Sequence, residues 1–277
     1  MLERTTRFLK SRGIDTPRLD TELLLCKHMG VDRLHLYLSL DQPLGDAELA
    51  AMRPDVSRRG SREPLYWILG ERGFHAIELH TPVGVLVPRP DTETLVEAAL
   101  AVIPRSEEPV YIADVGCGTG AIGLALAVAR PEVRLFATDV SPAAIAATKE
   151  NVRRLGLERR VAVLLGDLLS PIPPHRPVDW VLSNPPYIPS GELDGLQPEV
   201  SQHEPRLALD GGADGLDVYR RLIPQGLARA RQGVLVELGM GQADAVASIF
   251  RQHGLASPRR WSDLGGVERV VGGPISP

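Results

Sequence analysis

The strongest constraint on the fold is a regular alternation of two kinds of segment after residue 91. Short segments rich in β-branched residues, which favour strands, are separated by longer segments whose apolar residues recur at helical spacing. We expect strands at 110–115, 133–138, 161–165, 178–182 and 234–238, and helices that begin at 91 or span 121–129, 142–155 and 243–252. Strands that alternate with helices form βαβ units, so the sequence predicts an α/β domain with a mostly parallel sheet.

Residues 1–70 follow a different pattern. Leu19, Leu23 and Leu24 recur at helical spacing after a helix start signal at Thr16-Pro17, and no strand pattern of useful length is found there. Residues 71–90 alternate in part between apolar and polar positions and contain turn signals, which predicts a β-hairpin. We therefore expect a helical domain at 1–70, a hairpin linker at 71–90 and an α/β domain at 91–277.

The composition limits the class of protein. No stretch approaches the ~18–20 apolar residues that cross a bilayer, and the N-terminus lacks the apolar segment of a signal peptide, so a cytoplasmic protein without a membrane partner is expected. The net charge of −4 argues against a protein whose main task is to grip duplex nucleic acid. Cys26 and Cys117 lie far apart without metal-ligand spacing, so we expect reduced cysteines and no metal site.

A glycine-rich loop follows the first expected strand of the α/β domain and opens a helix. Residues 114–120 of this loop read Asp-Val-Gly-Cys-Gly-Thr-Gly. The glycines allow a sharp turn and a close approach of the backbone to a ligand. Such a loop alone is compatible with a dinucleotide, a nucleoside or no ligand, but its G-x-G-x-G spacing differs from the G-x-G-x-x-G of pyrophosphate sites.

Three carboxylates follow or end expected strands, at the edge where open α/β sheets bind ligands. Asp139 can accept both hydroxyls of a ribose, which suits nicotinamide cofactors and S-adenosylmethionine equally, and its alternative role is to cap the next helix. Asp167 can accept from an adenine amino group. Asp114 can hold the amides of its own loop, as a structural brace, or the amino group of a cofactor.

The second motif is Asn184-Pro185-Pro186-Tyr187, at the end of the fourth expected strand. The two prolines end the strand and lock the backbone, so the side-chain oxygen of Asn184 and the carbonyl of Pro185 are expected to face one cavity. Two such acceptors can hold both N–H groups of an amide or aniline-type NH2, and they bind more strongly as positive charge builds on nitrogen. Tyr187 offers a flat face to a planar acceptor. The alternative is a structural Pro-Pro turn with a capping Asn.

With these motifs, the sequence resembles the HemK (PrmC) family, glutamine N5-methyltransferases of class 1 peptide-release factors. The resemblance runs over nearly the whole chain. Beyond the two motifs, it includes segments at 17–20 (P-R-L-D), 63–70 (E-P-L-Y-W-I-L-G), 87–93 (V-P-R-P-D-T-E), 204–212 (E-P-R-L-A-L-D-G-G) and 214–219 (D-G-L-D-V-Y). The Asn-Pro-Pro-Tyr turn alone is shared with adenine N6-methyltransferases, so the choice of this family depends on the segments at 63–70 and 87–93.

The resemblance implies a class I S-adenosylmethionine-dependent methyltransferase domain, Rossmann-like with a mostly parallel seven-stranded sheet. It also implies a small N-terminal helical domain that helps to hold the release factor. The expected reaction transfers a methyl group from S-adenosylmethionine to N5 of the glutamine in a Gly-Gly-Gln motif and leaves S-adenosylhomocysteine. The expected partners are therefore class 1 release factors, without direct contact with nucleic acid, and a monomer is expected.

The site residues expected on this basis form three sets. Catalytic residues are Asn184, Pro185 and Tyr187, and substrate contacts are these three with Pro186 and Arg89. Cofactor contacts are Asp114, Gly116, Cys117, Gly118, Thr119, Gly120, Asp139, Asp167, Leu168 and Asn184. Two points stay open: Pro88-Arg89-Pro90 either borders the site or is a rigid linker turn, and relatives often have an aromatic residue where this chain has Leu168.

Other functions share part of this evidence. A DNA or RNA adenine-N6 methyltransferase would use the same turn but should carry a basic recognition region. A glutamine methyltransferase of a ribosomal protein would differ mainly in the N-terminal region. A nicotinamide-dependent oxidoreductase would need the other glycine spacing and would leave residues 184–187 unexplained, and a non-catalytic module would not need both motifs.

Overall fold

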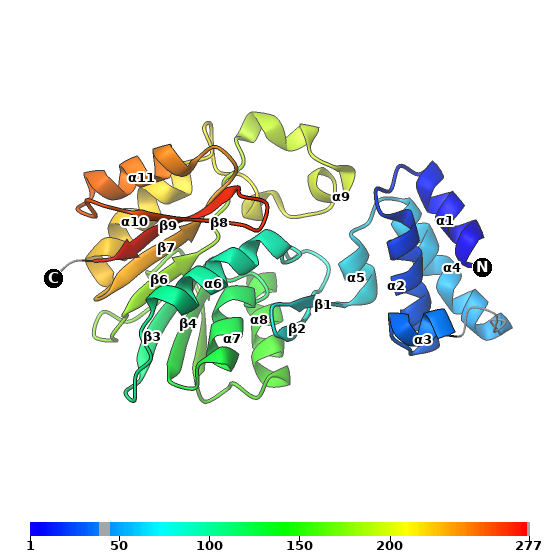
Figure 1. Ribbon diagram of the computed structural model, residues 1–277, viewed down its shortest axis with the longest axis horizontal. Coiled ribbons are helices and arrows are strands. Elements are labelled where there is room, and N and C mark those ends of the chain that lie inside the picture. Colours follow the sequence, from blue (N-terminus) through cyan, green and yellow to red (C-terminus); the bar gives the residue numbers. More distant parts are fainter. Residues whose placement is uncertain (39–44, 276–277) are drawn as a thin grey trace. The chain divides into compact units, whose positions relative to one another are not determined.

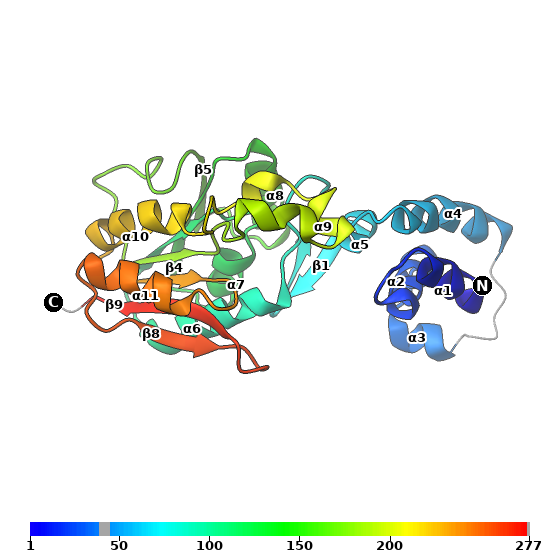
Figure 2. The ribbon, with the colours of Figure 1, turned by 90° about the horizontal axis from the view of Figure 1, so that it is seen from above.

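The computed structural model describes residues 1–38 and 45–275, which fall into two units. Unit 1 comprises Met1–Glu71 and Gln197–His203, and unit 2 comprises Arg72–Leu196 and Glu204–Pro277. Most helices and strands of both units are labelled in Figure 1, and β5 is labelled in Figure 2. No helix in the described ranges is long and apolar enough to cross a membrane.

Unit 1 is helical, as the sequence predicts. Its helices are α1 (Leu2–Ser11), α2 (Pro17–Met29), α3 (Arg33–Leu38), α4 (Asp46–Gly60), α5 (Leu65–Leu69) and α9 (Pro198–Ser201). Helix α2 begins at Pro17, whose fixed φ suits a first turn, and ends before Gly30, which has a left-handed φ of 65°. Buried apolar side chains from α2 to α5, among them Leu24, Met52 and Ile68, pack into one core.

The α9 segment joins unit 1 from a distant part of the chain. Glu199 in α9 accepts from the Arg59 guanidinium at 2.9 Å, and Arg59 Nε donates to the buried Asp20 carboxylate at 2.6 Å. These contacts attach α9 to α2 and α4. The sequence instead predicts one long Gly- and Asp-rich loop of the α/β domain at 188–215, because the pattern of a short segment does not reveal its distant partners.

A seven-stranded sheet forms the centre of unit 2, with the strand order β5-β4-β3-β6-β7-β9-β8. Its strands are β3 (Val110–Val115), β4 (Val133–Asp139), β5 (Val161–Leu165), β6 (Trp180–Ser183), β7 (Gly233–Glu237), β8 (Arg259–Ser262) and β9 (Glu268–Pro274). Strands β3 to β7 pair in parallel, whereas β9 is antiparallel to β7 and β8 is antiparallel to β9. The predicted mostly parallel sheet is confirmed, and the five predicted strands agree with β3–β7 to within two residues.

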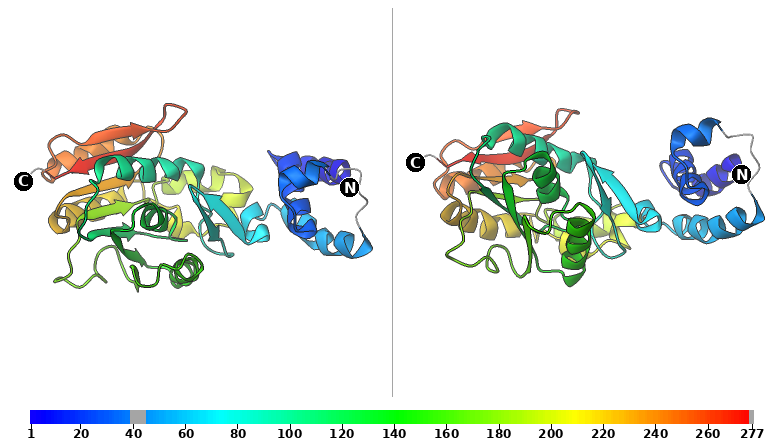
Figure 3. Two further views of the ribbon diagram at one scale, coloured as in Figure 1. Left: turned by 60° about the horizontal axis from the view of Figure 1, so that its bottom comes forward. Right: turned by 90° about the horizontal axis from the view of Figure 1, so that it is seen from below.

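Helices cover both faces of this sheet. They are α6 (Glu93–Val102), α7 (Ala121–Ala129), α8 (Pro142–Arg154), α10 (Asp217–Arg229) and α11 (Ala243–Gln252). Successive residues of a strand point to opposite faces, so Ile112 packs in the core with α6 and α7, and Ala113 packs in the core with α10 and α11. Figure 2 and Figure 3 show these layers from further directions.

Helix α10 and the β8–β9 hairpin are not among the predicted elements. Pro224 lies inside α10 and interrupts the pattern of a helix, although the buried Tyr219, Leu222 and Ile223 keep helical spacing. In residues 71–90, the strands are restricted to β1 (Glu71–Phe74) and β2 (Ile77–His80), which form a two-stranded sheet. The rest of that segment is a loop that leads to the short 3-10 helix η1 (Pro90–Thr92).

Candidate active site

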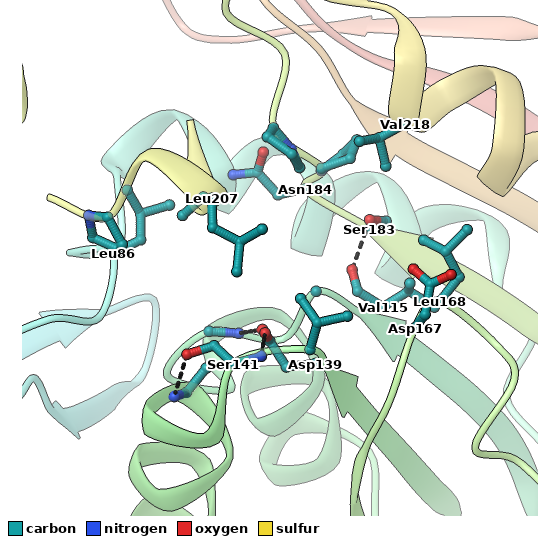
Figure 4. Close-up of a pocket in the computed structure, with 18 of the residues that line it drawn as sticks. Leu86, Val115, Asp139, Ser141, Asp167, Leu168, Ser183, Asn184, Leu207 and Val218 are labelled. Carbon is teal, nitrogen blue, oxygen red and sulfur yellow. Dashed lines mark hydrogen bonds between the residues drawn. The ribbon is translucent and has the colours of Figure 1, made fainter. Parts of the chain in front are cut away.

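A cavity lies at the carboxyl ends of β3, β4, β5 and β6, within unit 2 (Figure 4). Its empty volume is about 940 Å³, including its open mouth, which is in the size range of cofactor sites. Eight of the predicted site residues line it: Gly116, Gly118, Asp139, Asp167, Leu168, Asn184, Pro185 and Pro186. The structure therefore brings the glycine-rich loop and the Asn-Pro-Pro turn to one cavity.

Strand β4 holds the glycine-rich loop by backbone hydrogen bonds. Both Gly116 N and Cys117 N donate to the carbonyl oxygen of Thr138, at 2.8 and 3.0 Å. Gly118 has a left-handed φ of 57°, and a Cβ added to it would meet no atom within 4 Å. Because Gly118 also lines the cavity, the loop presents bare backbone to the space where a ligand would lie.

Asp139 holds the same loop from the end of β4. Its Oδ2 accepts from Gly118 N at 3.0 Å, and its Oδ1 accepts from Ser141 N at 2.8 Å. Burial raises the pKa of this carboxyl, while the two backbone hydrogen bonds oppose the rise. Ser141, and not Asp139, caps α8, since its hydroxyl accepts from Ala144 N at 3.3 Å. A carboxylate oxygen has a second lone pair, so Asp139 retains acceptor capacity toward the cavity.

Asp114 lies beneath the loop and does not line the cavity. Its Oδ2 accepts from Gly123 N in α7 at 2.9 Å, and its Oδ1 is buried without a hydrogen-bond partner among the described residues. Complete burial raises the pKa of this carboxyl to about 7. The arrangement is that of a brace between β3 and the first turn of α7.

Three further loop residues also point away from the cavity wall. The Cys117 thiol is buried 3.4 Å from the hydroxyl of Thr148, and burial raises its pKa well above the ordinary value. Thr119 is buried, and Gly120 is the N-cap of α7 with a left-handed φ of 86°. None of the three lines the cavity, and their predicted cofactor contacts stay predictions.

The turn after β5 forms another part of the wall. Leu168 has a left-handed φ of 48°, and its carbonyl oxygen accepts from the hydroxyl of Thr138 at 2.9 Å. Asp167 is half exposed and pairs with Arg221 of α10, which also lines the cavity. The Asp167 carboxylate thus lies at the cavity edge with one oxygen engaged by Arg221.

Asn184 projects from the end of β6, where the preceding Ser183 hydroxyl anchors the strand by donating to Val115 O at 2.7 Å. Its side-chain nitrogen donates to the hydroxyl of Thr92, in η1, at 3.1 Å. With the nitrogen end of the amide engaged there, Oδ1 is the end left to accept from a ligand. Pro185 and Pro186 continue the wall beside it.

Tyr187 does not line the cavity, although it follows the two prolines directly. Its ring is partly buried against the core that contains α10 and α11, and this burial raises the pKa of its hydroxyl to about 12. Gln242 Nε2 donates to the Tyr187 carbonyl oxygen at 2.9 Å. In this conformation the Tyr187 ring is not placed to stack on a planar substrate in the cavity, so that predicted role stays a prediction.

Arg89 does not line the cavity either. Its guanidinium forms an ion pair with Glu204, whose other carboxylate oxygen accepts from Val87 N at 3.3 Å. Glu204 is buried, which raises its pKa, and the charge of Arg89 opposes that rise. The loop at 204–208 is thereby fixed to the segment before η1, and its residues Pro205, Leu207 and Ala208 line the cavity.

Thr92 and Glu204 are residues of the site that the sequence did not lead us to predict. Both occur in segments that carry the family resemblance, at 87–93 and 204–212, and this was the available signal. The sequence did not indicate that Thr92 contacts Asn184 or that Glu204 contacts Arg89. The two residues of each pair are about 90 or more positions apart in the chain.

The site fits S-adenosylmethionine as judged by its own geometry. The bare backbone at Gly118 permits close approach, Asp139 offers acceptor capacity beside it, and Asp167 and Leu168 extend the wall in a separate direction. The carboxyl ends of β3, β4 and β5 are where an α/β sheet of this kind binds a nucleoside. Among the described residues, no cluster of His, Cys, Asp and Glu could hold a metal ion.

Comparison with known proteins agrees with this geometry. Residues 1–70 match the PrmC N-terminal domain, and residues 92–198 match the methyltransferase small domain. The chain is 42% identical over 277 residues to the release factor glutamine methyltransferase of Geobacter sulfurreducens, covering 99% of this chain and 95% of that protein. It is also 42% identical over 287 residues to the release factor glutamine methyltransferase of Rhodospirillum rubrum, with 100% and 86% covered.

A solved structure supports the fold alone. The hMettl16 catalytic domain, in complex with a MAT2A 3′UTR hairpin, superposes with a TM-score of 0.61 at 16% identity, covering 86% of this chain and 95% of that chain. The sequence identity to the bacterial proteins, by contrast, extends over both parts of the chain. This chain therefore belongs to the family of release factor glutamine methyltransferases, which are S-adenosylmethionine-dependent enzymes.

Proposed function

We propose that this enzyme methylates the side-chain amide nitrogen, N5, of the glutamine in the Gly-Gly-Gln motif of class 1 peptide chain release factors. The observation that carries the proposal is that Asn184 and Pro185 line the same cavity as Gly118 and Asp139. A glutamine side chain is a planar amide with two N–H donors, and the Asn-Pro-Pro turn supplies two acceptors for them.

The chemistry of the acceptor explains why these two groups are needed. An amide nitrogen is a poor nucleophile because its lone pair is delocalised into the carbonyl. Asn184 Oδ1 and the Pro185 carbonyl each accept one N–H, so they orient the nitrogen and favour its pyramidalisation. Positive charge builds on nitrogen in the transition state and strengthens both hydrogen bonds, so the stabilisation is greater there than in the ground state.

The cofactor half of the cavity has a separate task. S-adenosylmethionine, when bound, would supply an electrophilic methyl group, with S-adenosylhomocysteine as the leaving group and one proton of the amide nitrogen lost to solvent. In this chain the backbone of the 114–120 loop, Asp139, Asp167 and Leu168 would hold the cofactor, and the turn at 184–186 would align the amide nitrogen with that methyl group. Alignment of this kind accounts for a large part of the rate, so no strong base is required of the protein.

The choice of a release factor depends on parts of the chain outside the turn. The relatives with 42% identity are named release factor glutamine methyltransferases, and their similarity includes the helical residues 1–70. The net charge of −4 gives no general attraction for nucleic acid. We infer that the helical domain holds the release factor while the Gly-Gly-Gln tip reaches the cavity.

A labelling experiment tests this proposal. The enzyme is incubated with methyl-labelled S-adenosylmethionine and, separately, with a class 1 release factor, a duplex DNA, or a preparation of ribosomal proteins. We expect label in the release factor alone and loss of that label when the motif glutamine is replaced by alanine. Label in the DNA would favour the adenine-N6 function, and label in a ribosomal protein would move the substrate to that class.

A further inference from the structure

Glu237 is a buried carboxyl that the proposed reaction does not use. It ends β7, is 1% exposed and does not line the cavity. Its Oε2 is buried without a hydrogen-bond partner in the described part of the chain. Placing such a group in the interior is costly unless its neighbours engage it, so its presence at the back of the Asn184 site calls for a role.

The immediate neighbours of this carboxyl are Thr92 and Asn184, and hydrogen bonds from both side chains favour its ionised form. Asn184 Nδ2 also donates to Thr92 Oγ1, at 3.1 Å. The three side chains therefore form one polar cluster, contributed by η1, the end of β6 and the end of β7. Of the three, only Asn184 lines the cavity.

Burial raises the pKa of Glu237 to about 8, although the hydrogen bonds of Thr92 and Asn184 oppose the rise. The other ionisable groups that act on this carboxyl are Asp91 and Arg269, which pair with each other at 2.6 Å. Two tyrosines, at positions 187 and 219, face it as well. The Tyr219 hydroxyl donates to the Glu237 backbone oxygen at 2.7 Å and leaves the side chain free.

An asparagine amide has two ends of nearly equal shape, and a half-turn about its last bond exchanges Oδ1 for Nδ2. Only the oxygen end can accept an N–H of the substrate amide. A threonine hydroxyl can donate or accept, so Thr92 alone does not decide which end of Asn184 it engages. A carboxylate only accepts. When Glu237 is ionised, Thr92 and Asn184 Nδ2 must therefore both donate to it, the Thr92 oxygen also accepts from Nδ2, and Oδ1 is left for the cavity.

We propose that Glu237 is a positioning residue that, together with Thr92, holds the side-chain oxygen of Asn184 toward the substrate amide. The proposal rests on the assignment of Asn184 as a substrate contact. It adds that residues of β7 and η1 determine which end of the Asn184 amide faces the substrate. Neither the Asn-Pro-Pro turn nor the glycine-rich loop determines this.

Three variants test the cluster, each measured for kcat and KM with a release factor as substrate. Thr92→Val removes the hydroxyl at nearly constant volume and should lower kcat about 10- to 100-fold, because misorientation of a reacting group has effects of that size. Glu237→Gln keeps the shape but both donates and accepts, so kcat should fall by about 10-fold. Thr92→Ser keeps the hydroxyl and should retain kcat within about 3-fold. KM should change less than kcat in all three.

The pH dependence of kcat gives a readout that loss of stability would not produce. With an ionised Glu237 the direction of the hydrogen bonds is fully determined, so kcat should rise through about pH 8 in the wild type. Glu237→Gln should lack this rise. The same pH profile in Glu237→Gln and the wild type would overturn the proposal.

Tyr219→Phe is the matched control, because it removes a buried hydrogen bond to Glu237 without altering the three-residue cluster. It should lower the midpoint of thermal unfolding but leave kcat within about 3-fold of the wild type. Folding of each variant is checked by its circular dichroism spectrum, and cofactor affinity by calorimetry. If Tyr219→Phe lowers kcat as much as Thr92→Val does, the effect is structural and the positioning role is refuted.

The double variant Thr92→Val/Glu237→Gln completes the test. Residues that act as one unit have non-additive effects, so the double variant should be no slower than Thr92→Val alone. Multiplied effects would mean independent roles and would contradict the proposal. Failure of the proposed function is distinguishable, since a fully active Asn184→Ala would refute it, whereas an inactive Asn184→Ala beside a fully active Thr92→Val refutes the positioning role alone.

Discussion

Two buried carboxyls, Asp114 and Glu237, contact segments that line the cavity, and their contacts differ in kind. Asp114 accepts from the first turn of α7, after the glycine-rich loop, and Glu237 adjoins Asn184 of the Asn-Pro-Pro turn. Burial raises the pKa of the first to about 7 and of the second to about 8, and each has one oxygen without a hydrogen-bond partner in the described ranges. Asp114 holds a backbone amide nine residues away, whereas Glu237 adjoins side chains of two distant elements.

The difference separates two kinds of binding surface. The proposed cofactor half, formed by the 114–120 loop with Asp139, Asp167 and Leu168, presents loop backbone held by Thr138 O and by the Asp139 carboxylate. The proposed acceptor half, residues 184–186, relies on one side chain, that of Asn184, whose nitrogen donates to Thr92. Backbone geometry is shared among many hydrogen bonds, so we expect substitutions in the cofactor half to have graded effects. In the acceptor half, loss of one oriented group should be severe.

The largest expected effect is that of Asn184→Ala. It removes an acceptor that strengthens in the transition state, so kcat should fall at least ~10²-fold, as for the loss of one oriented polar group in other enzymes. Cofactor affinity, measured by calorimetry, should stay within about 3-fold because the loop and Asp139 remain. Normal turnover in this variant would refute the proposed mechanism and remove the contrast between the halves.

The next effect is that of Asp139→Ala, which frees the amides of Gly118 and Ser141. A hydrogen bond to a charged group contributes about 1.5–3 kcal/mol, so the Kd for S-adenosylmethionine should rise about 10- to 100-fold. The kcat at saturating cofactor should change much less. Asp139→Asn, which keeps one acceptor oxygen, should have an intermediate Kd. A large loss of kcat with unchanged Kd would place Asp139 in the acceptor half instead.

The smallest effect is on stability, in Asp114→Asn. Burial raises the folded-state pKa of Asp114 to about 7 from its ordinary 3.8, so the folded protein binds this proton more tightly than the unfolded chain does. Stability of the wild type should therefore fall as pH rises from about 4 to about 7 and change no further above that range. Over this pH range, the free energy of unfolding of the wild type should fall by roughly 1–2 kcal/mol more than that of the variant. A pKa shift of about three units allows up to ~4 kcal/mol, but buried sites relax and admit water, which lowers the effect.

Urea unfolding of both proteins at pH 5 and pH 8 measures this difference. The asparagine side chain of the variant would still present an oxygen to Gly123 N, so the brace itself is retained while the titrating group is removed. Parallel changes of stability with pH in the two proteins would mean that Asp114 does not carry the raised pKa. The first buried carboxyl would then differ from Glu237 in its electrostatics as well as in its contacts.

The local parts of the fold and of the cavity were predictable. The five parallel strands have β-branched residues and follow or precede helices with strong periodicity, so their positions agree within two residues. The glycine-rich loop, Asp139 and residues 184–186 are placed at the cavity because each ends a parallel strand, and such ends meet at one edge of a sheet. Helix α10 escaped prediction because of Pro224, and the β8–β9 hairpin gave no clear pattern.

Side-chain direction and distant partners were not predictable. Asp114, Cys117, Thr119 and Tyr187 belong to the correct motifs, yet their side chains do not line the cavity. The pairing of Arg89 with Glu204, and the attachment of 197–203 to the helical unit, join segments that are remote in the chain. Nothing in the composition or periodicity of either partner specifies the other.

The amino-acid sequence by itself determined the helical and α/β parts, the five parallel strands with the helices between most of them, and the two motifs that meet at the strand ends. These depend on periodicity, proline and glycine, which act within a few residues. Only the tertiary structure decided which atoms of those motifs face the cavity and what holds them there. The reason is that the direction of a side chain such as Asn184 is set by hydrogen bonds to Thr92, and by its proximity to Glu237, across elements that only folding brings together.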